Sequence, residues 1–352
     1  MIAGARDAGL GARGARLRRM ASAFRLKAAV IVFALLLAPV TAFAQGARLA
    51  VIVGLAGDAE YAELYGKWGA SLVDAATGRY GIARDHVVYL TEKPDQDAKR
   101  ATGRSTREEI AKAFASLAGA APDDLIFVVL IGHGTFDGKV AKFNLPGPDM
   151  TAADFDPLLK RLAPRRVVLI NTASASGPFI EALSGPGRTI VTATRNGRES
   201  FATIFGGYFV DALTSDVADA DKNKRVSVLE AFDYARREVQ TAYERQGIML
   251  TEHALLDDAG DREGSAQPAA DGKVGKVAAL ISLGAAGQTD SLPADPKVRA
   301  LYDERRALER RVESLRLMKD SMEPAKYTAE LETLVTELAL KTRQIRDVEG
   351  KK

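Results

Sequence analysis

Two short, almost purely aliphatic runs constrain the fold of this chain more than any other feature. The first is 125–131, LIFVVLI, and the second is 167–170, VVLI. Strands buried on both faces of a parallel sheet have this composition. Gly-His-Gly follows the first run at 132–134, and a turn of small residues follows the second at 172–176. Functional groups of open α/β sheets gather just beyond the carboxyl ends of the strands, so we expect His133 and this turn to meet at one sheet edge.

Three further strands are predicted at 48–53, 86–90 and 188–194, from their β-branched and aliphatic residues. Segments with helical spacing alternate with the strands at 61–77, 110–117, 155–162, 178–183, 204–213 and 229–239. Ser105 is expected to cap one of these helices, with Glu108 completing a capping box. The alternation predicts an α/β fold with a mostly parallel sheet, right-handed crossovers and flanking helices.

The first 44 residues have the pattern of a secretory leader. A basic segment precedes an apolar run at 28–37, which is too short to span a bilayer. Ala42-Phe43-Ala44 has the small residues of a cleavage site, so the mature chain is expected to begin at Gln45 and to be periplasmic or secreted. An uncleaved membrane anchor is the alternative, and Met20 is an alternative start.

Charge and cysteine content exclude several classes of function. The leader carries seven Lys or Arg and one Asp, a net of +6, so its removal changes the formal charge of the chain from +3 to −3. The basicity belongs to the leader, and we therefore expect no nucleic-acid partner. Membrane contact is expected only if the leader remains attached. The chain contains no cysteine, which excludes disulfides, thiolate metal sites and cysteine nucleophiles.

The C-terminal part has two runs of apolar residues with helical spacing, separated by a turn at 322–324. Leu301, Leu308 and Leu315 recur at seven residues in the first run. This pattern predicts a helical hairpin, or antiparallel coiled coil, that either packs on its own domain or joins chains into a homo-oligomer. The expected parts are a leader at 1–44, an α/β domain at 45–262, a linker at 263–296 with one apolar segment (274–283), and the hairpin at 297–348.

Residues 219–230, DADKNKRVSVLE, have the spacing of a calcium-binding loop. Positions 1, 3, 5, 7, 9 and 12 are occupied by Asp219, Asp221, Asn223, Arg225 (through its main chain), Ser227 and Glu230. The departure is Lys224, where the sharp turn normally requires glycine. The alternative is a polar turn in which Ser227 caps the next helix and Glu230 completes a capping box. Ca²⁺ is the one ion that the sequence suggests, and no other cofactor is expected.

With these elements in order, the chain resembles the caspase-like cysteine peptidases, and most closely the legumain group. In that group one strand ends in His-Gly and the next in Ala-Cys-x-Ser-Gly. The corresponding segments here are VVLIGHG, with His133 and Gly134, and ASASG at 173–177. The loops GLAGDAEY and ATRNGRES are also similar, and the resemblance covers 48–258. It implies a caspase-like fold and a site that acts on peptides.

The resemblance also implies the roles of the site residues. His133 is the expected base, and the backbone amides of Gly134 and residue 174 are the expected oxyanion donors. The nucleophilic cysteine of the family is replaced by Ser174. A serine needs a hydrogen-bonded base that a carboxylate orients, and Asp137 is merely the nearest acid in sequence. We therefore expect a non-catalytic protein that binds a peptide or protein partner. The alternative is an active peptidase with Ser174 as nucleophile and His133 as base.

Overall fold

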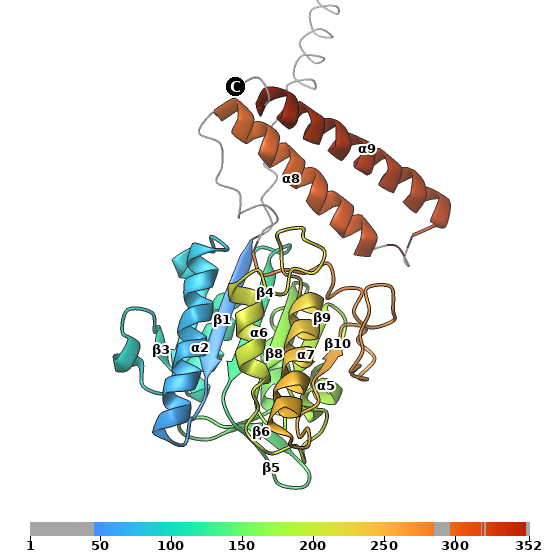
Figure 1. Ribbon diagram of the computed structural model, residues 1–352. Coiled ribbons are helices and arrows are strands. Elements are labelled where there is room, and N and C mark those ends of the chain that lie inside the picture. Colours follow the sequence, from blue (N-terminus) through green and yellow to red (C-terminus); the bar gives the residue numbers. More distant parts are fainter. Residues whose placement is uncertain (1–45, 285–295, 318, 320–321, 350–352) are drawn as a thin grey trace, which may run out of the picture. The chain divides into compact units, whose positions relative to one another are not determined.

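The computed structural model describes residues 46–284, 296–317, 319 and 322–349, and the expected leader lies outside them. An α/β unit holds a seven-stranded sheet with helices on its faces (Figure 1). In spatial order the strands are β10 (Leu255–Asp257), β9 (Arg188–Thr192), β8 (Arg166–Asn171), β4 (Leu125–Ile131), β1 (Ala47–Val53), β2 (Val87–Thr91) and β3 (Gly103–Arg104).

Every neighbouring pair in this sheet is parallel except β9 with β10. The predicted fold class, α/β with a mostly parallel sheet, is therefore confirmed. The central strands β1, β4 and β8 carry the aliphatic runs, because strands covered on both faces of a sheet bury nearly every side chain. The short strands β3 and β10 were not predicted.

Helices form a layer on each face of the sheet. They are α2 (Ala59–Gly78), α3 (Arg107–Leu117), α4 (Ala152–Lys160), α5 (Pro178–Leu183), α6 (Phe205–Thr214) and α7 (Val228–Gln246). One apolar core joins alternate residues of β1, such as Leu49 and Val51, to α2, α6 and α7. A second core joins Ala50 and Ile52 to α3, α4 and α5. The alternation of side chains along each strand thus supplies both cores.

A small antiparallel sheet follows directly after β4. Its strands are β5 (Gly134–Phe136), β6 (Ala141–Phe143) and β7 (Met150–Thr151). The backbone N–H of Asn144 donates to the His133 carbonyl (3.0 Å), which joins this sheet to the end of β4. These strands have two or three residues each, too few to show a period-two pattern in the sequence.

The start of α3 differs from the expected cap. Thr106, rather than Ser105, is the N-cap, because its side chain accepts the N–H of Glu109. Ser105 is fully buried, and its hydroxyl has no hydrogen-bond partner. The prediction for Ser105 was wrong by one residue, since the adjacent Ser and Thr are both favourable N-cap types and residue type alone does not decide between them.

Residues 274–283, expected to be the apolar segment of a linker, take part in the core. Ala278, Ile281 and Leu283 are buried in the cluster that includes α7. The backbone N–H of Val228 donates to the Ile281 carbonyl (2.8 Å). The α/β unit therefore continues to the end of this segment.

The predicted helical hairpin is present as α8 (Pro296–Leu317) and α9 (Pro324–Glu349). The buried residues of its apolar seam are Leu308, Val312, Leu315 and Leu334. An ion pair between Lys341 and Glu304 (2.5 Å) joins the two helices beside the seam. Among the described helices, none is long and apolar enough to cross a membrane.

Candidate functional site

Ser174 lies in a tight turn between β8 and α5, at the carboxyl edge of the sheet. Its side chain is buried, with 3% of the residue exposed. The next residue, Ala175, has a φ of 54°, in the left-handed region that residues with a Cβ avoid. The N–H of Ala175 donates to the Glu199 carbonyl (2.8 Å), which helps to hold this conformation. Backbone strain of this kind is concentrated at functional turns.

Ser176 joins the turn to the end of β9. Its Oγ accepts the backbone N–H groups of Ala193 (3.1 Å) and Thr194 (3.2 Å). At Gly177 a Cβ would lie 2.2 Å from the carbonyl carbon of Arg195, so this backbone approach requires glycine. The Ser-Gly pair of the motif therefore has a structural role, which is to lock the turn against β9.

His133 follows β4 directly and packs edge-on between two tyrosines of α2. The ring centroids lie 4.6 Å from Tyr61 and 5.3 Å from Tyr65. The Tyr65 hydroxyl lies 3.3 Å from Nδ1 of His133. Burial lowers the pKa of His133 below its usual value, while a hydrogen bond to the Ala56 backbone and the charge of Asp58 act in the opposite direction. The imidazole is therefore neutral at pH 7 and able to accept a proton.

Ser174 and Gly134 form a closed hydrogen-bonded pair. The Gly134 N–H donates to Ser174 Oγ (3.1 Å), and Oγ donates to the Gly134 carbonyl (3.0 Å). A Cβ at position 134 would lie 2.2 Å from the Ser174 carbonyl oxygen, so this approach also requires glycine. Among the hydrogen bonds of the described residues, none joins Ser174 to His133. The three motif residues share one sheet edge, but Oγ is directed at Gly134.

Asp137 is not placed to orient His133. It lies in the β5–β6 turn, where it accepts two backbone N–H groups of that turn and pairs with Lys142 (3.4 Å). The acid whose charge acts on His133 is Asp58, the N-cap of α2. The sequence marks Asp58 only as the residue before a helix, so its nearness to His133 follows from the fold.

A second histidine, His253, is linked to the Ser174 turn through Glu199. Its Nδ1 lies 2.7 Å from Glu199 Oε1, and its backbone N–H donates to Oε2 of the same carboxylate (3.1 Å). Glu199 also pairs with Arg195 (3.2 Å) and holds the Ala175 N–H through its carbonyl. No motif surrounds His253 in the sequence, and the unpredicted strand β10 is what brings it to this edge.

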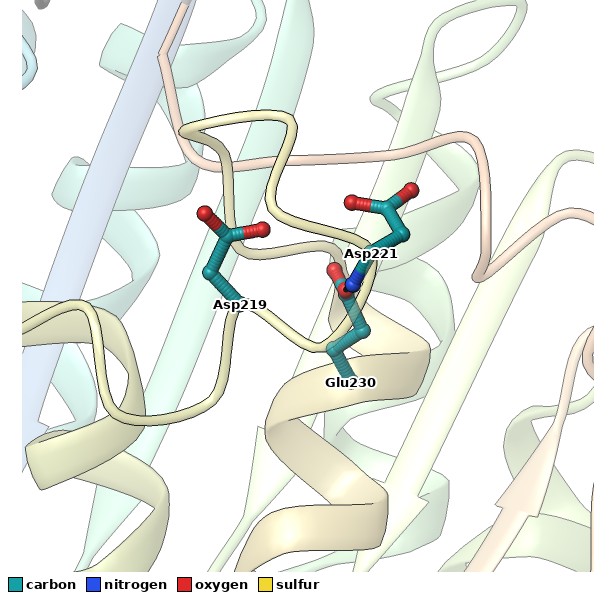
Figure 2. Close-up of side chains that lie close together, drawn as sticks. All are labelled: Asp219, Asp221 and Glu230. Carbon is teal, nitrogen blue, oxygen red and sulfur yellow. Dashed lines mark hydrogen bonds between the residues drawn. The ribbon is translucent and has the colours of Figure 1, made fainter.

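The 219–230 loop brings three carboxylates together (Figure 2). One oxygen each of Asp219, Asp221 and Glu230 lies within 4.8 Å of the others. Two oxygens that bind one Ca²⁺ at about 2.4 Å are at most about 4.8 Å apart, so the spacing fits this ion. Lys224 has a φ of 65°, so the sharp turn is made although the glycine is missing.

The hydrogen bonds of the same loop also fit the alternative interpretation, a polar turn that caps the next helix. Ser227 Oγ accepts the Glu230 N–H (3.2 Å), and Glu230 Oε2 accepts the Ser227 N–H (2.8 Å), which completes a capping box at the start of α7. The other oxygen, Oε1, accepts the N–H of Ala220 (3.0 Å). Asn223 and Arg225 contribute to the turn, where the Arg225 N–H donates to Asn223 Oδ1 (2.8 Å). The cap thus fixes Glu230 beside the two aspartates.

Comparison with known families gives one match. Residues 106–256 match the model of the Peptidase C13 family. The matched range extends from the start of α3 to β10 and contains both motifs, with His133, Gly134 and Ser174. The resemblance to the legumain-type peptidases is thereby confirmed for this part of the chain. No curated protein matches the chain.

Proposed function

Because the chain has the fold of a Peptidase C13 domain, we propose that it is an exported, non-catalytic member that binds a peptide or protein partner. The meeting of the two motifs at the carboxyl edge of the sheet supports a partner site there, because functional groups of open α/β sheets gather at such edges. The site has the histidine and the glycine that the resemblance implies, and it lacks the nucleophile.

The observation that carries this proposal is the closed pair of Ser174 and Gly134. An attacking serine must give its proton to a base, whereas Oγ gives its proton to the Gly134 carbonyl (3.0 Å). An oxyanion donor must point at the reacting carbonyl, whereas the Gly134 N–H points at Oγ (3.1 Å). The Ser174 hydroxyl proton and the Gly134 N–H are therefore both engaged within the protein. His133 is hydrogen-bonded to Tyr65 rather than to Ser174.

The test is a peptide-library digestion with three purified proteins: wild type, Ser174→Cys and Ser174→Ala. We expect no cleavage by wild type or by Ser174→Ala. Cleavage by Ser174→Cys alone is the strongest support, because a thiol is partly thiolate at neutral pH and needs less help from His133. Cleavage by wild type that Ser174→Ala abolishes would establish the alternative, an active peptidase with Ser174 as nucleophile and His133 as base.

Binding has to be tested separately from cleavage. Immobilised wild-type protein is incubated with the same library, and retained peptides are identified. The matched control is Gly177→Ala, in which a Cβ would lie 2.2 Å from Arg195 and displace the turn. Peptides retained by wild type and released by the control support a site at the turn. Equal retention by both proteins contradicts it.

Calcium binding at 219–230 is a second proposal, favoured by the three carboxylates within 4.8 Å of one another. Asp219, Asp221 and Glu230 would supply side-chain ligands, with Asn223, Ser227 and the Arg225 main chain at the remaining positions. An ion bound only by the folded state raises the Tm as its concentration rises. We expect a rise with millimolar CaCl₂ that EDTA reverses and that Asp221→Asn lacks. The same Tm in EDTA and in CaCl₂ would contradict the proposal.

Association through the hairpin is a third expectation that stays a proposal. Sedimentation of the purified chain at several concentrations tests it. A homo-oligomer that becomes monomeric when α8 and α9 are deleted supports it, and an oligomer that persists without them contradicts it.

A further inference from the structure

A cavity of about 180 Å³ lies between α7 and the segments on either side of β10. Most of its wall is apolar and includes Phe205, Val239 and Leu250. Ala266 and Gln267, which also line it, are exposed, so a small molecule can enter from solvent. A cavity of roughly 150 Å³ with apolar walls accommodates a benzene molecule. The cavity therefore has room for one compact apolar group.

Arg236 of α7 adds a cation to this wall. Its Nε is buried and has no hydrogen-bond partner among the described residues. An unsatisfied buried donor costs free energy, and the cost is larger when the donor belongs to a charged group. A ligand with an anionic oxygen would remove this cost, because a charge-assisted hydrogen bond to a guanidinium is stronger than a neutral one.

Arg236 differs from the other arginines that bury Nε without a hydrogen-bond partner. In the described part of the chain these are Arg48, Arg79 and Arg305. Each of the three has an ion pair with a carboxylate, from Asp124, Asp216 and Glu309 respectively. Within the same part of the chain, no ion pair reaches Arg236. The arginine that lines the cavity is thus the one whose charge the protein leaves unmatched.

Glu252, the carboxylate in the cavity wall, is engaged elsewhere. It accepts the backbone N–H groups of Ile204 (3.0 Å) and Phe205 (3.1 Å) and the hydroxyl of Tyr243 (3.1 Å). The two N–H groups lie at the start of α6, where the positive end of the helix dipole offsets the charge of the carboxylate. Glu252 therefore needs no cation from a ligand, and it does not supply the acceptor that Arg236 lacks.

Two more ionisable groups lie near the cavity. Asp233 precedes Arg236 by one turn of α7; burial raises the pKa of this carboxyl, while the charges of Arg236 and Arg237 act in the opposite direction. The charge of Asp233 is thus shared between two arginines. His253, in the cavity wall, is paired with Glu199 (2.7 Å). The group at the cavity that still requires a partner is the guanidinium.

We infer that this cavity binds a small monocarboxylate with a compact apolar body, aromatic or branched, of about the size of benzoate. The carboxylate accepts hydrogen bonds from Arg236, and the apolar body lies against Phe205, Val239 and Leu250. Neither His133 nor Ser174 lines the cavity, so the inference is independent of the proposed peptide-binding function.

Four small probes separate the effect of charge from that of apolar size. NMR titration of the purified full chain with benzoate, at constant ionic strength, measures the Kd. Benzamide keeps the ring without the charge, benzylamine reverses the charge, and acetate keeps the carboxylate without the ring. We expect benzoate to bind at least about tenfold more tightly than each of the other three.

Three variants assign the binding to this cavity. Arg236→Met removes the guanidinium and keeps a flexible apolar side chain, so the Kd for benzoate should rise about tenfold or more while the ligand-free Tm does not fall. The matched control is Arg237→Met, because Arg237 is the adjacent arginine, is exposed and does not line the cavity. It should bind benzoate as wild type does. Ala266→Trp adds bulk at the mouth from an exposed position and should also weaken binding.

Each of several results would overturn the inference. These are no benzoate binding by wild type, equal affinity for benzoate and benzamide, and equal affinity for benzoate and acetate. An unchanged Kd for benzoate in Arg236→Met shows that the anion binds elsewhere and also contradicts it. If Arg236→Met does not fold, Ala266→Trp decides: weaker benzoate binding than in Arg237→Met supports the cavity, and equal binding contradicts it.

Discussion

Ser174 has an oxygen atom where the cysteine of the related peptidases has sulfur. This replacement affects the hydrogen bonds that the side chain makes with Gly134. The hydroxyl is short and a strong donor and acceptor, so it closes two hydrogen bonds with Gly134. A thiol makes weaker hydrogen bonds and would leave the Gly134 amide available. At this position the serine therefore stabilises the turn, and it stands in place of the thiol that the resemblance implies.

Gly134→Ala tests whether the contact with Ser174 is as close as the geometry indicates. The new Cβ would lie 2.2 Å from the Ser174 carbonyl oxygen and 3.0 Å from that of Lys142. Displacing backbone atoms in a packed site costs about 1–3 kcal/mol of unfolding free energy. Urea denaturation should show this loss.

The matched control is Gly66→Ala, a glycine of α2 whose Cβ would meet no atom within 4 Å. This change should be neutral or stabilise the protein by up to about 1 kcal/mol, because alanine favours a helix. If both variants have the same stability, the close approach of Gly134 to Ser174 is contradicted.

Burial of His133 predicts a specific pH dependence of stability. Its folded-state pKa lies below the unfolded value of about 6.5. The unfolded chain then binds more protons, so this contribution is complete above about pH 6.5 and is lost as the pH falls below it. Between about pH 7.5 and 5, wild type should lose more unfolding free energy than His133→Gln. Above about pH 7.5 the two proteins should show equal slopes, and equal slopes throughout would contradict the assignment.

At the scale of elements, the sequence predicted the strands and helices whose apolar residues follow a regular periodicity. The aliphatic strands β1, β4 and β8 and the amphipathic helices were found close to their expected bounds. The strands β3, β5, β6, β7 and β10 were not predicted as such, because they have two or three residues and depend on pairing with neighbours. Strand β10 brings His253 to Glu199, and for this reason this pair was missed.

The hairpin is an element whose stability should come from one seam. Leu334 is 2% exposed within the seam, and Leu340, in the same helix, is 58% exposed. Leu334→Ala should destabilise the hairpin by about 2–5 kcal/mol, and Leu340→Ala by less than about 0.5 kcal/mol. Hydrogen exchange of the α8 and α9 amides measures both. If amide exchange is accelerated equally in the two variants, the assignment of Leu334 to the buried seam is contradicted.

For the whole molecule, the sequence predicted the fold class and the meeting of its two motifs more reliably than the extent of the α/β unit. The composition of 263–284, rich in Gly and Ala, is typical of a linker. The structure instead inserts three small or aliphatic side chains of this segment into the α7 core. Their contacts are with residues far away in sequence, so no local pattern indicates them.

Two truncated chains test where the α/β unit ends. Both begin at Gln45, and they end at residue 262 or at residue 290. Ile281 and Leu283 are each at most 3% exposed, and burial of one such side chain contributes about 1.5–3 kcal/mol. Neither sheet-face core contains a residue of α8 or α9 among those described. The longer chain should therefore keep the near-UV circular dichroism and the Tm of the unit, while the shorter one loses at least about 3 kcal/mol of unfolding free energy. If the shorter chain is equally stable, residues 263–284 are a linker after all, and their place in the core adds nothing to the fold.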